Sequence, residues 1–472
     1  MLDVIIRNGR IVDWKNNIDE VGNLGVENGR IVFASGRDEA ARQEFDARGM
    51  LVIPGIIDSH MHASSWLGGP MSFRMLAAAG VTTAMEMAGP IDSVRQYLAA
   101  CGTGLNIAVL EQLRPMKNIS SSDPGRKELE NAVEAALDRG AYGVKLLGGH
   151  YPMTPEATSR LIDLCSEKRV FLAIHAGTTQ NGSNISGMEQ IIDLARGRAF
   201  HLAHINAYCR GKVRPLREEI DRAEQLLLAH PEIETESYLS PINGCSGRCV
   251  SSVPESGVTR SCLAASGYEP TRNGLAAAIR EGAARVHVQH DGRIVLADAE
   301  EGFALWQQKD SDVPVSFNVN PALSRFFFAV SKRPDGRFLV DSFCTDGGGI
   351  PRNVILSSGL PLVRFNAISL KEFVLKSSYA AACQMGLSTK GHFSAGADAD
   401  IAIVDPSSQR AVCTIASGRV IYQNNQFPVA GGVLITTPLA TRTKFEPGLT
   451  TLFVDVPANL EKRRAKLRDS RA

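Results

Sequence analysis

The chain of 472 residues is 44% hydrophobic and 21% charged and has a formal net charge of +1, which excludes the basic surface typical of nucleic-acid-binding proteins. No stretch approaches the roughly 20 consecutive apolar residues that a membrane helix needs, and residues Met1–Arg10 lack the pattern of a signal peptide. The nine cysteines are an odd number without framework spacing, so we expect a cytoplasmic protein whose thiols stay reduced.

Short β patterns separated by glycine turns occupy the beginning of the chain, up to about Val52. Similar patterns return near the other end, at Ala399–Val404 and Thr414–Tyr422. We therefore expect a small β-sandwich domain built from both chain ends, residues 1–53 and 390–440. Its first four strands are predicted at Asp3–Arg7, Arg10–Asp13, Asn23–Glu27 and Arg30–Ala34.

Over residues 54–389, apolar runs alternate with helical patterns, which is typical of βα units and a parallel sheet. Eight such units predict an α/β fold, a closed (β/α)8 TIM barrel. The predicted strands are Leu51–Ile57, Val81–Met87, Leu105–Leu110, Gly143–Leu146, Phe171–His175, Ala199–His204, Ile233–Glu236 and Phe338–Phe343. The predicted helices include Arg126–Arg139, Pro155–Lys168, Gly187–Arg196 and Leu216–His230.

Two stretches interrupt this alternation. Residues 237–274 are rich in Ser, Gly, Pro and Cys and are predicted to be an irregular insertion that arches over the barrel mouth. Residues 285–314 are predicted to form a second insertion, a hairpin followed by a helix. Residues 441–472 form a C-terminal extension, in which the basic segment Leu460–Ala472 is predicted to be a solvated helix.

Polar side chains stand at the C-terminal ends of the predicted barrel strands, on the face where barrel active sites are built. His60 and His62 are two residues apart at the end of the first buried run, so they point the same way. The other strand-end residues are Lys145, His175, His204 and Asp346.

Each of these residues taken singly is more often structural, because a lone strand-end histidine is usually not a ligand and a lone lysine is usually a surface charge. Burying imidazoles, an amine and a carboxylate together is costly, however, and a divalent metal offsets that cost. The set therefore predicts a metal site at the barrel mouth.

The segment Pro54-Gly55-Ile56-Ile57-Asp58-Ser59-His60-Met61-His62 resembles the first-strand motif of the amidohydrolase superfamily. Gly80-Val81-Thr82-Thr83 resembles the superfamily's second-strand entry, and Gly391–Ile401 resembles its return to the small sandwich. The resemblance covers nearly the whole chain and is weakest between Ser237 and Phe338. It is specific for the superfamily and much less so for a substrate.

The resemblance implies two divalent ions, with zinc as the first expectation and manganese, iron or cobalt left open. His60, His62 and Asp346 would hold the more buried ion, and His175 and His204 the more exposed one. Lys145 would be carboxylated by carbon dioxide and bridge both ions, and the open alternative is an uncarboxylated lysine beside a mononuclear site. A metal-bridging hydroxide would attack the carbonyl, with Asp346 as general acid/base towards the leaving nitrogen.

The lysine-bridged pattern implies the hydantoinase, dihydroorotase and allantoinase branch, which opens cyclic amides, or relatives such as the N-acyl-D-amino-acid deacylases. Dihydroorotases carry an arginine just after the paired histidines, where this chain has Ala63-Ser64-Ser65-Trp66, so a dihydroorotase is disfavoured. The candidate substrate contacts are Tyr151 or His150 for the developing oxyanion, Asn206 and Tyr208 facing the cavity, and Arg210 for a carboxylate.

The first expectation is therefore a metal-dependent hydrolase that opens a cyclic amide or ureide. An N-acyl amino acid deacylase with the same binuclear site is the enzymatic alternative, and a non-catalytic amidohydrolase-like scaffold is the alternative of another class. The expected partner is a small-molecule substrate, not nucleic acid or a membrane, and the resemblance implies a homo-oligomer, a dimer or tetramer. Cys245, Cys249 and Cys262 give only a weak zinc pattern, because no histidine lies nearby to complete it, and loop thiols are the favoured interpretation.

Overall fold

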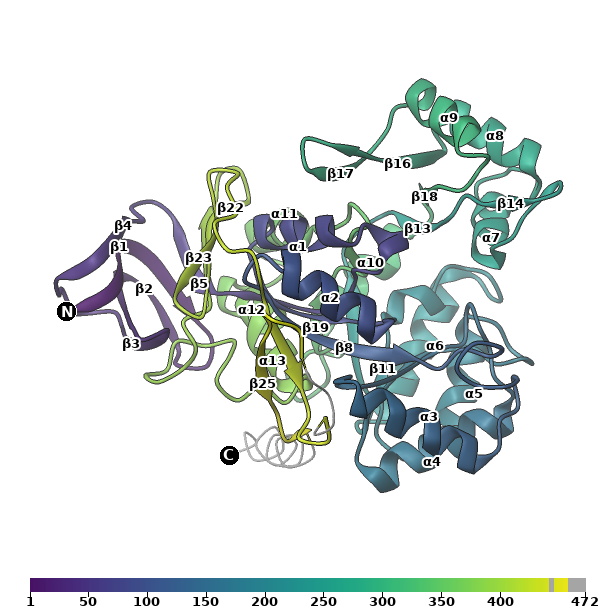
Figure 1. The fold of residues 1–472 in the computed structure, drawn as a ribbon, viewed down its shortest axis with the longest axis horizontal. Helices are drawn as coiled ribbons and strands as arrows, with labels where there is room; N and C mark the ends of the chain where they lie inside the picture. The colour runs from purple at the N-terminus through teal and green to yellow at the C-terminus, as the bar shows by residue number, and fades with distance from the viewer. Residues whose placement is uncertain (441–444, 457–472) are drawn as a thin grey trace.

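The computed structural model describes residues 1–440 and 445–456. Figure 1 shows a small sheet near the N-terminus, a central barrel, and a lobe that projects from the barrel on the side away from that sheet. The helix predicted at Leu460–Ala472 lies outside the described residues.

The central sheet is a ring of parallel strands in the order β6-β7-β8-β9-β10-β11-β12-β19, with β20 continuing after β19. β19 pairs with β12 and β20 pairs with β6, so this one segment closes the ring. The strands are β6 (Ile56–His62), β7 (Val81–Glu86), β8 (Asn106–Gln112), β9 (Gly143–Leu147), β10 (Phe171–His175), β11 (His201–Leu202), β12 (Glu234–Tyr238), β19 (Ser342–Cys344) and β20 (Gly347–Gly348).

Helices follow most of these strands and bury one face against the ring. In α3 (Arg126–Asp138), Leu129, Val133, Ala136 and Leu137 are buried, at a spacing that puts them on one helix face. Because the intervening helices return every strand in the same direction, the C-terminal strand ends all meet at one rim. The other helices around the ring are η1 (Ser65–Leu67), α1 (Pro70–Ala78), α2 (Ile91–Cys101), α4 (Pro155–Lys168), α5 (Ile185–Ala195), η2 (Ile205–Tyr208), α6 (Leu216–Ala229), α10 (Ala322–Val330), α11 (Ile355–Arg364), α12 (Leu370–Val374), η3 (Leu375–Tyr379) and α13 (Ala380–Gln384).

The small sheet joins strands from both ends of the chain, because β21 pairs antiparallel with β5. Its order is β23-β22-β21-β5-β1-β2-β3, with β4 beside β1. The predicted fold class, a TIM barrel with a small β domain from both chain ends, is confirmed. The strands are β1 (Leu2–Asp13), β2 (Ile18–Glu27), β3 (Arg30–Ala34), β4 (Ala41–Asp46), β5 (Leu51–Pro54), β21 (Ile401–Asp405), β22 (Arg410–Ala416) and β23 (Arg419–Gln423).

The chain crosses from the small sheet into the barrel at Gly55. A Cβ atom there would lie 2.2 Å from Thr82 Oγ1, so a side chain would push the first barrel strand away from the second. The prediction of one strand over Leu51–Ile57 is therefore wrong, because β5 ends in the small sheet and β6 begins in the barrel. As a result, His60 and His62 lie inside a barrel strand and not after one.

The projecting lobe comprises residues 243–317 and has its own apolar core. The prediction of an irregular 237–274 segment is wrong for α7 (Gly257–Ala265) and for the start of α8 (Arg272–Arg280), whose first turns are capped by the side chains of Ser256 and Thr271. The hairpin and helix expected after Arg285 correspond to β16, β17 and α9. The elements are β13 (Asn243–Ser246), β14 (Cys249–Val250), β15 (Val253–Pro254), α7 (Gly257–Ala265), α8 (Arg272–Arg280), β16 (Ala284–His290), β17 (Arg293–Leu296), α9 (Ala299–Gln308) and β18 (Pro314–Phe317).

Other strand assignments also differ from the sequence patterns, and the strands predicted at Asp3–Arg7 and Arg10–Asp13 are a single strand, β1. Only His201–Leu202 is a strand within the stretch predicted at Ala199–His204. The strand expected at Phe338–Phe343 is Ser342–Cys344, which begins four residues later and ends one residue later. The unpredicted β24 (Val433–Thr436) pairs with β8 outside the ring and with β25 (Thr450–Phe453). Among the described residues, no helix is long and apolar enough to cross a membrane.

Candidate metal centre

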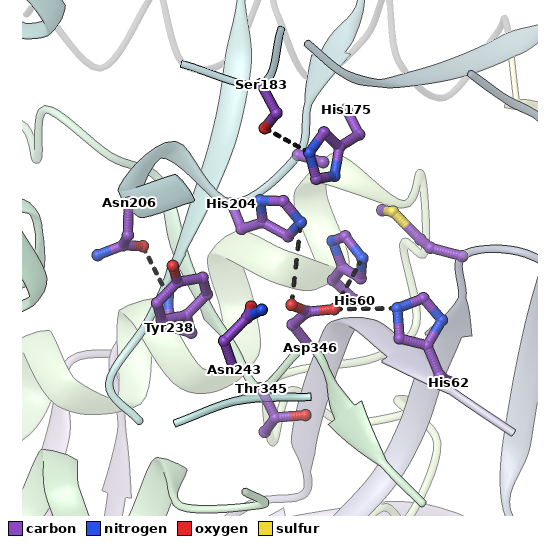
Figure 2. Close-up of polar contacts among 12 residues, drawn as sticks. His60, His62, His175, Ser183, His204, Asn206, Tyr238, Asn243, Thr345 and Asp346 are labelled. Atoms are coloured by element: carbon purple, nitrogen blue, oxygen red, sulfur yellow. Dashed lines mark hydrogen bonds and ion pairs between the residues drawn. The ribbon is translucent and has the colours of Figure 1, made fainter. Parts of the chain in front are cut away.

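Three side chains from the two ends of the barrel segment meet at the rim. His60 and His62 lie two residues apart in β6 and therefore point to the same side of the strand. Asp346 follows β19, and its Oδ1 lies 2.9 Å from His62 Nε2 and 3.5 Å from His60 Nε2 (Figure 2). Ligand atoms of these three residues all lie within 4.8 Å of one another, a grouping that can hold a metal ion.

His204 and His175 extend this group (Figure 2). His204 Nε2 lies 3.9 Å from Asp346 Oδ2, and the His204 ring stacks on that of His60 with 4.8 Å between centroids. The His175 ring meets His204 edge-on at 4.7 Å. Since His175 ends β10 and His204 closely follows β11, neighbouring strand ends deliver both imidazoles to the same place.

Lys145 lies in β9 and is fully buried. Its Nζ donates a hydrogen bond to Met87 Sδ over 3.1 Å, and a thioether is a weak acceptor. Burial lowers the pKa of this amine to about 8. Lys145 is therefore a buried amine without a strong polar partner among the residues that the structure describes.

The electrostatics of the group suit a metal site. Burial holds the pKa of His60, His175 and His204 well below its ordinary value, and the nearby Lys145 amine lowers it further. A neutral imidazole keeps a nitrogen lone pair, which is the form that binds metal. Because these imidazoles are neutral, they and the Asp346 carboxylate are suitable ligands for divalent transition-metal ions.

Two members of the group have an unusual backbone conformation. The φ angle of His204 is +28° and that of Asp346 is +49°, in the left-handed region that side chains other than glycine rarely adopt. Such conformations cost on the order of 1–3 kcal/mol each and concentrate at functional sites. The surrounding structure therefore holds both ligand-bearing residues in uncommon backbone conformations.

Buried carboxylates contact the histidines of this group. Glu236 in β12 accepts a hydrogen bond from His60 Nδ1 over 2.8 Å and another from the His204 backbone N–H over 2.8 Å, and its second oxygen pairs with His201. With Nδ1–H engaged, His60 presents Nε2 to Asp346, so Glu236 fixes the tautomer and the ring orientation.

Asp58 and Glu86 brace the backbone around the same residues. Asp58 accepts from the backbone N–H groups of His60, itself a candidate ligand, and of Thr345, which precedes Asp346. Burial raises the pKa of the Asp58 carboxyl to about 6. Glu86 accepts from the N–H groups of Ala88 and Gly89 and lies 3.8 Å from His62 Nδ1.

Two arginines border the group. Arg352 is fully buried, forms an ion pair with Asp346 and donates to the Ile242 carbonyl. Arg210, partly buried, donates from Nη2 to the Tyr238 hydroxyl over 3.0 Å and to Asn243 Oδ1 over 3.2 Å. The Nε atoms of both arginines are buried without a hydrogen-bond partner among the described residues.

The candidate substrate contacts have different surroundings. The Tyr208 hydroxyl accepts from the Ala176 N–H and donates to the Ala203 carbonyl, and Asn206 Oδ1 accepts from the Tyr238 N–H, so both side chains already brace the backbone. Tyr151 lies 4.0 Å under the Arg114 guanidinium. The exposed ring of His150 lies 5.8 Å from that of His175, so His150 borders the group and is open to solvent.

Sequence reasoning missed Glu236, Glu86, Tyr238 and Arg352. Glu236 ends the predicted strand Ile233–Glu236, and Glu86 lies one residue before the end of Val81–Met87, so the strand-end criterion used for the other ligands would have found both. Arg352 follows an irregular segment, and no local pattern indicates that it is buried.

The amino-acid sequence is similar to known proteins over parts of its length. No family model matches the chain. It is 31% identical over 152 residues to an adenine deaminase of Methanoregula boonei, covering 31% of this chain and 27% of the relative. It is 41% identical over 92 residues to an allantoinase of Rubrobacter xylanophilus, covering 18% of this chain and 19% of the relative. These alignments span less than a third of either curated relative.

Solved structures match over most of the chain. N-acyl-D-glutamate deacylase from Bordetella bronchiseptica, complexed with zinc and a phosphonate inhibitor, has a TM-score of 0.65 at 18% identity and covers 91% of this chain and 98% of its own. A D-aminoacylase with a binuclear metal centre has a TM-score of 0.66 at 16% identity, with coverages of 92% and 99%. L-Hydantoinase from Arthrobacter aurescens has a TM-score of 0.56 at 15% identity, with the same coverages.

Proposed function

The chain has the fold of the amidohydrolase superfamily, and from this premise we propose that it is a metal-dependent hydrolase that cleaves a carbon–nitrogen amide bond other than a peptide bond. The observation that carries the proposal is the meeting of His60, His62 and Asp346 within 4.8 Å at the strand-end rim. His175, His204 and the buried Lys145 adjoin them.

The proposed cofactor is a pair of divalent ions, most simply zinc, since imidazole and carboxylate donors suit it. His60, His62 and Asp346 would hold one ion, and His175 and His204 the other. Lys145 would bridge them after its neutral amine takes up carbon dioxide and releases a proton, giving an anionic carbamate with two oxygen donors. A mononuclear site with an unmodified Lys145 is the alternative.

When bound, such ions polarise a carbonyl oxygen and lower the pKa of water towards neutrality. The chain's own residues supply the rest of the reaction. The Asp346 carboxylate, at the centre of the group, takes a proton from the attacking water and returns it to the leaving nitrogen. Glu236 holds the His60 ring in its orientation by accepting a hydrogen bond from Nδ1.

The two arginines favour a substrate that carries a carboxylate. A buried guanidinium N–H without a partner is costly, and a substrate carboxylate would accept a hydrogen bond from the open Nε–H of Arg210. This observation favours an N-acyl amino acid, whose free carboxylate would face Arg210 while its amide lies at the metals. Ring opening of a cyclic amide or ureide is the second candidate, supported by the likeness to allantoinase and hydantoinase.

A substrate panel tests both candidates. The metal-loaded full chain is assayed against N-acetyl and N-formyl amino acids of both configurations and against hydantoins, dihydropyrimidines and allantoin, with Asp346→Asn as the control for contaminating activity. Turnover of either set by the wild type alone supports amide hydrolysis and identifies the class. Two bound metals without turnover of any member would instead support a non-catalytic scaffold.

A further inference from the structure

The His175 imidazole has a hydrogen-bond partner that the proposed reaction does not use. His175 Nε2 lies 2.6 Å from Ser183 Oγ, a contact that Figure 2 shows. Gly149 packs against the same edge of the ring, where a Cβ atom would lie 2.6 Å from Nε2 and 3.0 Å from Ser183 Cβ. The Nε2 edge of His175 is therefore filled by protein, and Nδ1 is the ring nitrogen that remains for a metal ion.

Ser183 is held in this position by the beginning of helix α5. It directly precedes Asn184, the N-cap residue, whose side chain accepts a hydrogen bond from the Gly187 N–H over 3.0 Å. The Asn184 N–H in turn donates to the Gly182 carbonyl over 2.9 Å, so hydrogen bonds fix the chain on both sides of Ser183. The serine hydroxyl thus reaches His175 from a capped helix start.

The imidazoles assigned to the two ions have different hydrogen-bond partners. Glu236, a carboxylate, accepts from His60 Nδ1 over 2.8 Å at the first ion position. At the second position, His204 Nδ1 is buried without a partner among the described residues, and His175 has the neutral Ser183 hydroxyl. Because such a partner fixes the tautomer and the ring orientation of a ligating histidine, the second position depends on Ser183 for this support.

We propose that Ser183 is a positioning residue that sets the affinity of the chain for the second of its two divalent ions, an inference that rests on the binuclear centre of the proposed function. In the metal-binding tautomer of His175, the proton resides on Nε2 and Ser183 Oγ accepts its hydrogen bond, which leaves the Nδ1 lone pair for the ion. Without the hydroxyl, the proton has no acceptor at Nε2, and the tautomer that carries it on Nδ1 cannot bind the ion. The first ion, held by His60, His62 and Asp346, does not depend on Ser183.

Titration of the metal-free full chain with Co²⁺ tests the proposal without any measurement of turnover. In a buffer that contains bicarbonate, the visible absorbance of bound cobalt and a competing chelator give the two dissociation constants. Ser183→Ala should raise the dissociation constant of the second ion about 10- to 100-fold and leave that of the first unchanged. Gly149→Ala, which inserts a methyl group beside Nε2 and Ser183, should have the same selective effect.

Two variants serve as controls. Ser183→Thr keeps the hydroxyl and should bind both ions as the wild type does, and so should Ser186→Ala, in the first turn of α5. The melting temperature of each metal-free variant shows whether it is folded. An unchanged second constant in Ser183→Ala, equal weakening of both ions, or an equal loss in Ser183→Thr would overturn the role of Ser183.

The same titration separates this inference from the proposed function. A wild type that binds a single Co²⁺ would overturn the binuclear centre and the role of Ser183 together. Two bound ions without turnover of any substrate would count against hydrolysis alone, and the dissociation constants would still decide whether Ser183 positions His175.

Discussion

His60 Nδ1 lies 2.8 Å from Glu236 Oε1, and both side chains are almost completely buried. The carboxylate thus reaches the imidazole from the side opposite to Asp346. Metal-binding histidines commonly have such a partner, which fixes the tautomer and raises the basicity of the ligating nitrogen. The contact joins β6 to β12 across the barrel interior and explains why a charged side chain is tolerated there.

Glu236→Gln should weaken metal binding by about 10- to 100-fold, because the amide keeps the shape of the side chain but loses its charge. Competition with a chelator of known affinity measures the change directly. Glu232→Gln, on the surface beside His230, is the matched control and should bind metal as the wild type does. Equal affinity in the two variants would contradict the role given to Glu236.

Lys145→Ala should lose activity and retain at most one metal ion per chain, because no anionic group remains to join two ions. Millimolar acetate or propionate should restore part of the activity by supplying a carboxylate in the vacated space. Metal analysis and kinetics of the variant provide the readout, with Lys127→Ala, an exposed lysine on α3, as control. Full activity without added acid would rule out the bridging carbamate and favour a mononuclear site.

The rate at which metal-free protein regains activity with carbon dioxide and metal should depend on pH. Only the neutral amine reacts, and a pKa of about 8 makes it increasingly available as pH rises towards 8. At fixed dissolved carbon dioxide, the rate should rise about tenfold from pH 6 to pH 7 and level off above pH 8. A rate that keeps rising to pH 10, as for an exposed lysine, would be inconsistent with a buried Lys145 amine.

Arg210→Met should raise KM for N-acyl amino acids about 10- to 100-fold, since hydrogen bonds to charged groups contribute about 1.5–3 kcal/mol. The turnover of an uncharged amide should change little, which separates lost carboxylate binding from a general disturbance. Arg217→Met, an exposed arginine paired with Asp221, is the control. Equal losses for charged and uncharged substrates would show that Arg210 acts structurally.

Much of the fold and the positions of several candidate metal ligands follow from local patterns in the sequence. The alternation of apolar runs and helical periods predicts the barrel, and the alternation of side chains along a strand predicts that His60 and His62 face the same way. The strand-end positions of His175 and His204 follow from the same patterns. Helices α7 and α8 were missed because a composition rich in Ser, Gly and Cys concealed their capping residues Ser256 and Thr271.

The sequence by itself indicated that the histidines and the aspartate of the candidate metal centre stand at strand ends, because hydrophobic period and strand direction are local properties of the chain. Only the tertiary structure decided what those groups meet. The hydrogen bond between Glu236 and His60 and the one that Asp58 accepts from the Thr345 backbone N–H both join residues distant along the chain. Such contacts depend on closure of the ring of strands, which no local pattern of residues encodes.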